Sequence, residues 1–222
     1  MLSFCINHLS PANELVYDRE LHRCYLLIYK NGTNSLNQLA FDEPSRFLYF
    51  LGSDSSQFLQ QNNVTELTVF VRNPIERFFS GLVTQCNRYK FDINVVLNIW
   101  EHGQDHHTHS RIQMFDEHTV PQFWYLLRAT KIPDLKFNVL PLDQISMIYP
   151  DSRRLNVNKK FDFSNVSASV MNKIDYYLTE DIVLYSQFQN KVVDLETIVS
   201  QIRLEKTFVE EYRSYYKLLT YL

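Results

Sequence analysis

Four short apolar runs, each ending in a polar turn, dominate the first two thirds of the chain. They lie at residues 24–29, 46–51, 67–72 and 136–141, and their length and composition suit buried parallel strands. Residues at helical spacing follow the turns, as Leu36, Leu39 and Ala40 do after the first run. Strands alternating with helices predict an α/β fold in three layers, with helices flanking a mainly parallel sheet of four or five strands.

Helix signals occupy most of the remaining chain. Asn73-Pro74-Ile-Glu76 supplies a cap, a proline at the first helical position and a capping-box glutamate, so a helix is expected from Pro74. Residues 90–130 are mostly helical in pattern, interrupted by a histidine-rich polar stretch at 101–109. The pattern is helical again from Ser167 to the end. No repeat or linker divides the chain, so residues 1–222 are expected to form one domain with a helical C-terminal extension at 191–222.

Composition and charge narrow the functional classes. The chain has 222 residues, of which 45% are hydrophobic and 21% charged, with a formal charge of −3. A general nucleic-acid binder usually carries a net basic balance, so no nucleic-acid partner is expected. The three cysteines are far apart, which indicates neither a disulfide framework nor a metal site. No signal-peptide pattern and no apolar run of roughly 18–20 residues is found, so we expect a cytoplasmic protein without a membrane partner.

The first turn, at residues 30–35, is a candidate phosphate site. Lys30-Asn31-Gly32-Thr33-Asn34-Ser35 follows the first apolar run and precedes a predicted helix, with Thr33, Asn34 or Ser35 as its cap. Glycine lets the backbone approach an anion, and a helix N-terminus offers unpaired N–H groups. The order is not that of a Walker loop, because the lysine precedes the only glycine. Asn31-Gly32 is also a common hairpin turn, so this loop alone is compatible with both interpretations.

The third apolar run ends in a second candidate, formed by Arg72 and Ser80. Arg72 is expected at the carboxyl edge of the sheet, where open α/β folds bind ligands. Ser80 follows two turns into the next helix. The alternative is an ordinary Arg72–Glu76 ion pair and a helix serine without a function. Considered together with the first loop, the pair favours a second phosphate site.

Both motifs carry a family resemblance. KNGTNSL resembles the 5′-phosphosulfate loop of sulfotransferases that use 3′-phosphoadenosine 5′-phosphosulfate (PAPS), and VRNPIERFFSGL resembles their 3′-phosphate element. The segment from His109 to Gln113 is similar to one in the Golgi-type carbohydrate sulfotransferases, and residues 155–160 and 174–181 look like the family's C-terminal stretch. The resemblance spans about residues 24–190. Asn34 departs from it, because many relatives have a hydroxyl there, and a short version without the stem or anchor of the Golgi enzymes is expected.

The resemblance implies a role for each matched residue. Lys30 would stabilise charge on the leaving nucleotide, the loop from Asn31 to Ser35 would hold the 5′-phosphate, and Arg72 with Ser80 would clamp the 3′-phosphate. It also implies PAPS as cofactor, no metal, and a hydroxyl-bearing acceptor, expected to be a sugar or glycan. Further nucleotide contacts are expected from Lys159 and Lys160, and acceptor contacts from Arg111 and Gln113.

A general base must take the proton of the acceptor hydroxyl. Three residues are candidates for this role: His109, Glu43 and Asp54. The histidines at 102, 106, 107 and 109 match no standard metal-ligand spacing, and a polar loop is the favoured interpretation. The tyrosines of the C-terminal extension are expected to pack, with a sugar-stacking surface or a homo-oligomer interface as the alternatives. Two functional alternatives stay open, namely a small-molecule kinase and a degenerate sulfotransferase fold that acts as a binding module.

Overall fold

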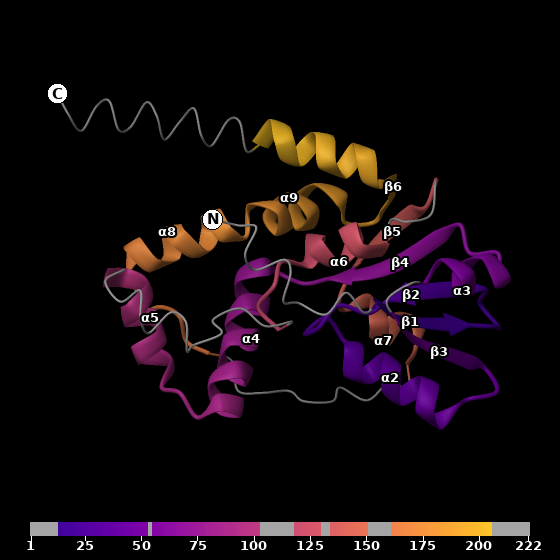
Figure 1. Ribbon diagram of the computed structural model, residues 1–222, viewed down its shortest axis with the longest axis horizontal. Coiled ribbons are helices and arrows are strands. Elements are labelled where there is room, and N and C mark those ends of the chain that lie inside the picture. The colour runs from indigo at the N-terminus through magenta and orange to yellow at the C-terminus, as the bar shows by residue number, and fades with distance from the viewer. Residues whose placement is uncertain (1–12, 53–54, 103–117, 130–133, 151–160, 206–222) are drawn as a thin grey trace.

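The structure, a computed structural model, describes residues 13–52, 55–102, 118–129, 134–150 and 161–205. It is an α/β protein with one six-stranded sheet in the order β3-β1-β2-β4-β5-β6 (Figure 1). The strands are β1 (Asn13–Asp18), β2 (Arg23–Leu26), β3 (Phe47–Gly52), β4 (Glu66–Val71), β5 (Lys136–Pro141) and β6 (Lys191–Asp194). All four predicted strands are confirmed within a few residues, while β1 and β6 were not predicted.

The sheet is mixed and has six strands, which corrects the expected number of four or five, while its centre is parallel as predicted. β2 pairs parallel with β4, and β4 parallel with β5. β1 pairs antiparallel with both β2 and β3, and β6 antiparallel with β5. The two strands that run against the rest are therefore the two that the sequence did not reveal. Residues 19–22 form only a tight connection between β1 and β2, which permits antiparallel neighbours.

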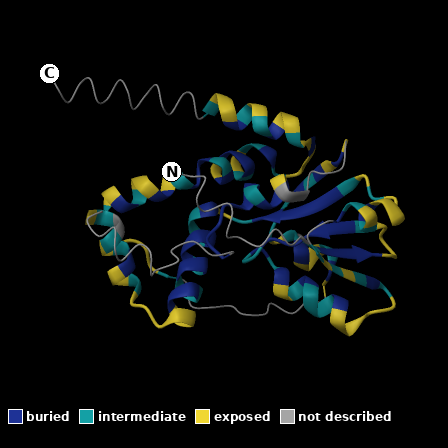
Figure 2. Ribbon diagram, in the orientation of Figure 1, coloured by how far each residue is buried: buried dark blue, intermediate teal, exposed yellow. Residues whose placement is uncertain are grey.

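Helices cover both faces of this sheet, as the pattern predicted. On one face, α2 (Thr33–Asp42) and α7 (Gln144–Ile148) pack on residues such as Val16, Tyr25 and Phe70. The other face contacts α3 (Ser56–Gln61), α6 (Gln122–Ala129), α9 (Thr179–Phe188) and the helical residues 195–205. Because neighbouring side chains alternate between the faces, the central strands are buried on both sides (Figure 2).

Three further helices form a separate apolar cluster beside the sheet (Figure 1). They are α4 (Pro74–Tyr89), α5 (Ile93–His102) and α8 (Ala168–Tyr177). Phe78, Phe79 and Leu82 of α4 pack there against Val170 and Ile174 of α8. Within the described ranges, no helix is long and apolar enough to cross a membrane.

Helix ends agree with the sequence at α4 and differ from it at α2. Asn73 caps α4, its side chain accepting a hydrogen bond from Glu76 N (3.1 Å), and Pro74 is the first helical residue. The residue before α2 is Gly32, with φ of 79°, so none of the three predicted side-chain caps serves this helix. At the other end of the chain, residues 191–194 form strand β6 and residues 195–205 are helical, which corrects the start of the predicted extension. Residues 206–222, with the tyrosines at 212, 215, 216 and 221, lie outside the described residues.

A buried carboxylate explains how the polar end of β1 enters the sheet. Asp18 is fully buried, and its carboxylate accepts hydrogen bonds from Arg46 Nη2 (2.8 Å) and from the hydroxyl of Tyr149 (2.9 Å). Burial alone would raise the pKa of Asp18, but the hydrogen bonds from Arg46, Leu21 N, Tyr149 and Glu20 N hold it below its ordinary value. Arg46 and Tyr149 come from distant parts of the chain, so the burial of Asp18 depends on the tertiary fold.

Candidate functional site

The two predicted phosphate motifs lie at the same edge of the sheet. β2 and β4 are parallel neighbours, and α2 and α4 begin just after their carboxyl ends (Figure 1). In the first loop, Asn31 N donates to Ile28 O (2.9 Å), which closes a tight turn. Lys30 (φ 70°) and Gly32 (φ 79°) both adopt the left-handed region. The loop therefore reverses sharply and directs the N-terminus of α2 toward the strand end.

Gly32 meets two structural requirements at once. Its φ is strained for any side chain, and an added Cβ would collide with the side chain of Ile145. Leu36 N makes the first helical bond of α2, to Gly32 O (3.1 Å), so the amides just before it have no partner within the helix. The Thr33 hydroxyl instead donates to Ile28 O (2.7 Å), and its proton is used inside the loop. Asn34 is exposed and Ser35 half-buried.

The second motif holds the ion pair that was its structural alternative. Arg72 Nη2 lies 3.5 Å from Glu76 Oε2, and the Arg72 side chain retains 24% of its exposure. Ser80 is half-buried two turns into α4, and its carbonyl accepts from the Thr84 hydroxyl (3.0 Å). Arg72 is therefore paired with Glu76 at the surface, and its side chain remains accessible to an anion.

Lys30 reaches from the first motif to the second. Its Nζ donates to the Thr84 hydroxyl at 2.6 Å. Because Thr84 is one turn after Ser80 on α4, the ammonium of Lys30 lies beside the helix that carries Ser80. Two cations, Lys30 and Arg72, thus stand at one edge of the sheet, together with the start of α2.

Gln122, at the start of α6, joins the two motifs directly. Its Oε1 accepts hydrogen bonds from Asn31 Nδ2 and from Arg72 N (3.0 Å), and its Nε2 donates to Arg72 O (3.0 Å). Asn31 Nδ2 also donates to Phe70 O (2.8 Å). The side chains of Asn31 and Gln122 are both buried. We call these three bonds of the Gln122 side chain the Gln122 bridge.

Two buried charges hold the backbone behind this bridge. The carboxylate of Asp181 accepts from Gln122 N (2.7 Å) and Phe123 N (2.9 Å). Burial raises the pKa of Asp181 to about 6, although the charge of Arg77 and these N–H donors oppose the shift. Arg77 is itself fully buried, and donates to Tyr29 O (3.0 Å) and Val120 O (2.6 Å). The Arg77 side chain therefore holds both Tyr29, which precedes Lys30, and Val120, which lies two residues before Gln122.

Other predicted site residues are not brought to this edge. Glu43 follows the last residue of α2, which has 10 residues, so it lies about 15 Å from the helix start. It is exposed, and its Oε2 lies 3.8 Å from Arg46 Nη1. The remaining candidates lie outside the described residues and stay predictions: Asp54, His109, Arg111, Gln113, Lys159 and Lys160. Among the described residues, no group of three histidine, cysteine or acidic side chains could hold a metal ion.

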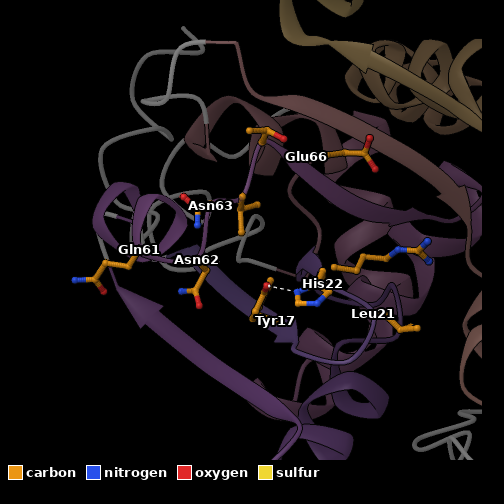
Figure 3. A pocket seen from close by; sticks show the side chains of 10 residues that line it. Tyr17, Leu21, His22, Gln61, Asn62, Asn63 and Glu66 are labelled. Carbon is orange, nitrogen blue, oxygen red and sulfur yellow. Dashed lines mark hydrogen bonds between the residues drawn. The ribbon is translucent and has the colours of Figure 1, made fainter.

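A cavity of about 620 Å³ lies at the opposite edge of the sheet (Figure 3). It is lined by residues of the turn after β1 and the turn before β4, including Leu21, Asn62 and Asn63. The Tyr17 hydroxyl and His22 Nδ1 lie 3.3 Å apart in its wall. Because these residues precede β2 and β4, the cavity is separate from the loops of Lys30 and Arg72.

Sequence reasoning missed the residues that hold the two motifs together. Arg77 did carry a signal, because it shares the buried face of α4 with Gly81 and Gln85, four residues apart. A charged residue in such a stripe indicates a specific buried partner. Gln122 and Asp181 have no comparable local pattern.

Comparisons with known proteins identify no relative of this chain. A scan against protein-family models finds none that matches this chain, and searches of curated proteins and of solved structures find no match either.

Proposed function

We propose that this chain is a PAPS-dependent sulfotransferase with the three-layer, P-loop-like sulfotransferase fold, which transfers a sulfuryl group to a hydroxyl, and that the acceptor is a sugar. The observation that carries the proposal is the Gln122 bridge. Its hydrogen bonds to Asn31 and Arg72 bring two motifs 41 residues apart in the sequence to one edge of the sheet. One motif alone would be a turn or an ion pair, whereas two adjacent motifs match a nucleotide with phosphates at both ends.

The donors at this edge fit such a nucleotide. The N-terminus of α2 and the ammonium of Lys30 suit the 5′-phosphate. The guanidinium of Arg72, with Ser80 on α4, suits the 3′-phosphate. PAPS supplies an activated sulfuryl group. The part of this chain is to bind it, and to keep Lys30 where negative charge develops on the departing nucleotide.

Two other functions remain to be separated from this one by experiment. A small-molecule kinase would use ATP, but Lys30 precedes the glycine of its loop, unlike the Walker order. A binding module of the same fold would hold the nucleotide without turnover. One observation favours the binding module. Glu43, one of the three predicted bases, lies at the far end of α2 from Lys30.

Ligand-dependent thermal unfolding tests the cofactor. The purified chain is heated with 3′-phosphoadenosine 5′-phosphate, ADP or ATP, beside Arg72→Ala and the control Arg88→Ala from the same helix. A ligand at 100 times its Kd stabilises the folded state by about 2.7 kcal/mol, which raises Tm by roughly 5–11 °C for a chain of this size. We expect this shift with the 3′-phosphorylated nucleotide only, and its loss in Arg72→Ala but not in Arg88→Ala. An equal shift with ATP would support the kinase, and no shift with any nucleotide would refute the proposal.

Transfer of labelled sulfate from PAPS to a panel of sugars then separates enzyme from binding module. Turnover that disappears in Lys30→Ala is the expected result. Binding without turnover of any acceptor would favour the module.

A further inference from the structure

We propose that Gln122 is a positioning residue that holds the 5′- and 3′-phosphate sites at a fixed separation, so that the two loops act as one receptor. This inference rests on the proposed function, since it concerns how the same nucleotide is held. Gln122 itself is fully buried and is not among the phosphate-binding donors.

The hydrogen bonds of Gln122 allow only one orientation of its amide. Arg72 N is a donor and must face Oε1, while Arg72 O is an acceptor and must face Nε2. The side chain thereby pairs with both backbone groups of one residue, as a strand neighbour would. The Asn31 amide is oriented in turn, because its Nδ2 donates both to Gln122 Oε1 and to Phe70 O. The loop of Lys30 is thus tied to the end of β4 through amides alone.

The bridge is also fixed from behind, which makes it a rigid spacer. The carboxylate of Asp181, from α9, accepts hydrogen bonds from the first two backbone N–H groups of α6. Arg77, from α4, holds Val120 O and Tyr29 O on either side of the bridge. Movement of Gln122 relative to Asn31 would therefore disturb buried bonds in four elements, a cost that keeps the two loops in register.

Fixed spacing matters only for a ligand that spans both sites. When one phosphate is bound, the second gains an effective concentration that depends on how well its site is prepositioned. A ligand with a single phosphate has no such gain. Loss of the Gln122 bridge is therefore expected to weaken a bisphosphate much more than either monophosphate.

Calorimetric titration tests this difference with three probes: 3′-phosphoadenosine 5′-phosphate, adenosine 5′-phosphate and adenosine 3′-phosphate. The variants are Gln122→Met, which keeps the size and removes all three bonds, and the control Gln201→Met in the C-terminal helical segment. We expect Gln122→Met to raise the Kd of the bisphosphate about tenfold or more, to raise the Kd of each monophosphate less than about threefold, and the control to change neither. Equal weakening of all three probes, or no weakening of the bisphosphate, would overturn the positioning role.

Gln122→Glu supplies a rescue that packing alone would not produce. An ionised glutamate keeps the acceptor for Asn31 and Arg72 N but cannot donate to Arg72 O. A protonated carboxyl group can donate again. The bisphosphate Kd of this variant, relative to wild type, is therefore expected to recover as pH falls from 8 to 5.5. A ratio that is constant over this range contradicts the role of the bridge, and the variant also replaces Gln122→Met if that protein does not fold.

A ligand-free measurement separates this inference from the proposed function. If the wild type binds none of the nucleotides, the proposed function fails, but hydrogen exchange of the Arg72 amide still reports on the bridge. We expect this amide to exchange faster in Gln122→Met than in wild type, with Gln201→Met unchanged. Equal protection of Arg72 N–H in all three proteins would show that Gln122 does not hold this loop.

Discussion

Gly81 in the middle of α4 provides a test in which two physical effects have opposite signs. In an ordinary helix interior, Gly→Ala stabilises a protein by about 1 kcal/mol, because alanine is the better helix former. At Gly81, however, an added Cβ would overlap the backbone carbonyl of His118 and lie in close contact with the His118 side chain. We therefore expect Gly81→Ala to destabilise the protein despite the improved helix propensity.

The magnitude follows from which atoms collide. Overpacking a well-packed site costs about 1–3 kcal/mol, and the upper end applies because a backbone carbonyl cannot rotate away as a flexible side chain can. The displaced segment also leads to Val120, whose carbonyl is bonded to Arg77. A cost of about 3 kcal/mol, less the gain of about 1 kcal/mol, leaves a net loss of about 2 kcal/mol. This corresponds to a Tm lower by about 4–8 °C.

Thermal and urea unfolding measure this loss, with Asn87→Ala as the matched control. Asn87 is exposed on the same helix, so its replacement removes no buried contact and is expected to raise stability by about 0.5 kcal/mol. A Gly81→Ala protein that is as stable as Asn87→Ala would refute the close approach of the His118 segment to α4. The support that this segment gives to Gln122 would then need another explanation.

Two further predictions concern buried carboxylates. Because the pKa of Asp181 is raised from 3.8 to about 6, the folded state keeps a proton that the unfolded state loses, and the free energy of unfolding falls as pH rises from about 4 to 6. In urea unfolding across this range, the stability of Asp181→Asn should depend on pH less than that of wild type, by about 1.4 kcal/mol per pH unit. Parallel curves of stability against pH for the two proteins would contradict the assignment. Arg46→Met leaves the carboxylate of Asp18 buried without its guanidinium, and should cost about 3 kcal/mol in urea unfolding at neutral pH. A loss below about 1 kcal/mol would mean that the pair behaves as an exposed one.

The sequence was informative about the fold wherever apolar residues follow one another without interruption. The runs at 46–51, 67–72 and 136–141 could be recognised as β3, β4 and β5 because an uninterrupted apolar run indicates a strand without reference to its distant partners. β1 escaped detection because only three of its residues are apolar, and its last, Asp18, enters the sheet through Arg46 and Tyr149. β6 has four residues within a helical pattern, and only its pairing with β5 makes it a strand.

The same distinction applies to the candidate site. Lys30, Gly32 and Arg72 could be located in advance because each follows an apolar run, at a place where strand and helix meet. The cap at Asn73 was predictable for the same reason. Gln122 was not, because a glutamine after a proline has many local interpretations, and its two partner residues, Asn31 and Arg72, lie 50 or more residues away. The hydrogen bond from the Thr33 hydroxyl to Ile28 O was also not predictable, because it depends on the geometry of the turn.

The Gln122 bridge means that the two motifs cannot be transplanted as a unit. A fragment that ended before residue 118 would contain every residue of both motifs, yet it would lack the amide that joins them and the carbonyl of Val120 that receives Arg77. The arrangement of the two motifs at one edge of the sheet therefore requires that the second half of the chain has docked against the first. Affinity for the proposed nucleotide is accordingly expected to report completion of folding, and a chain synthesised from its N-terminus would acquire the full arrangement only after α9, which carries Asp181, has formed.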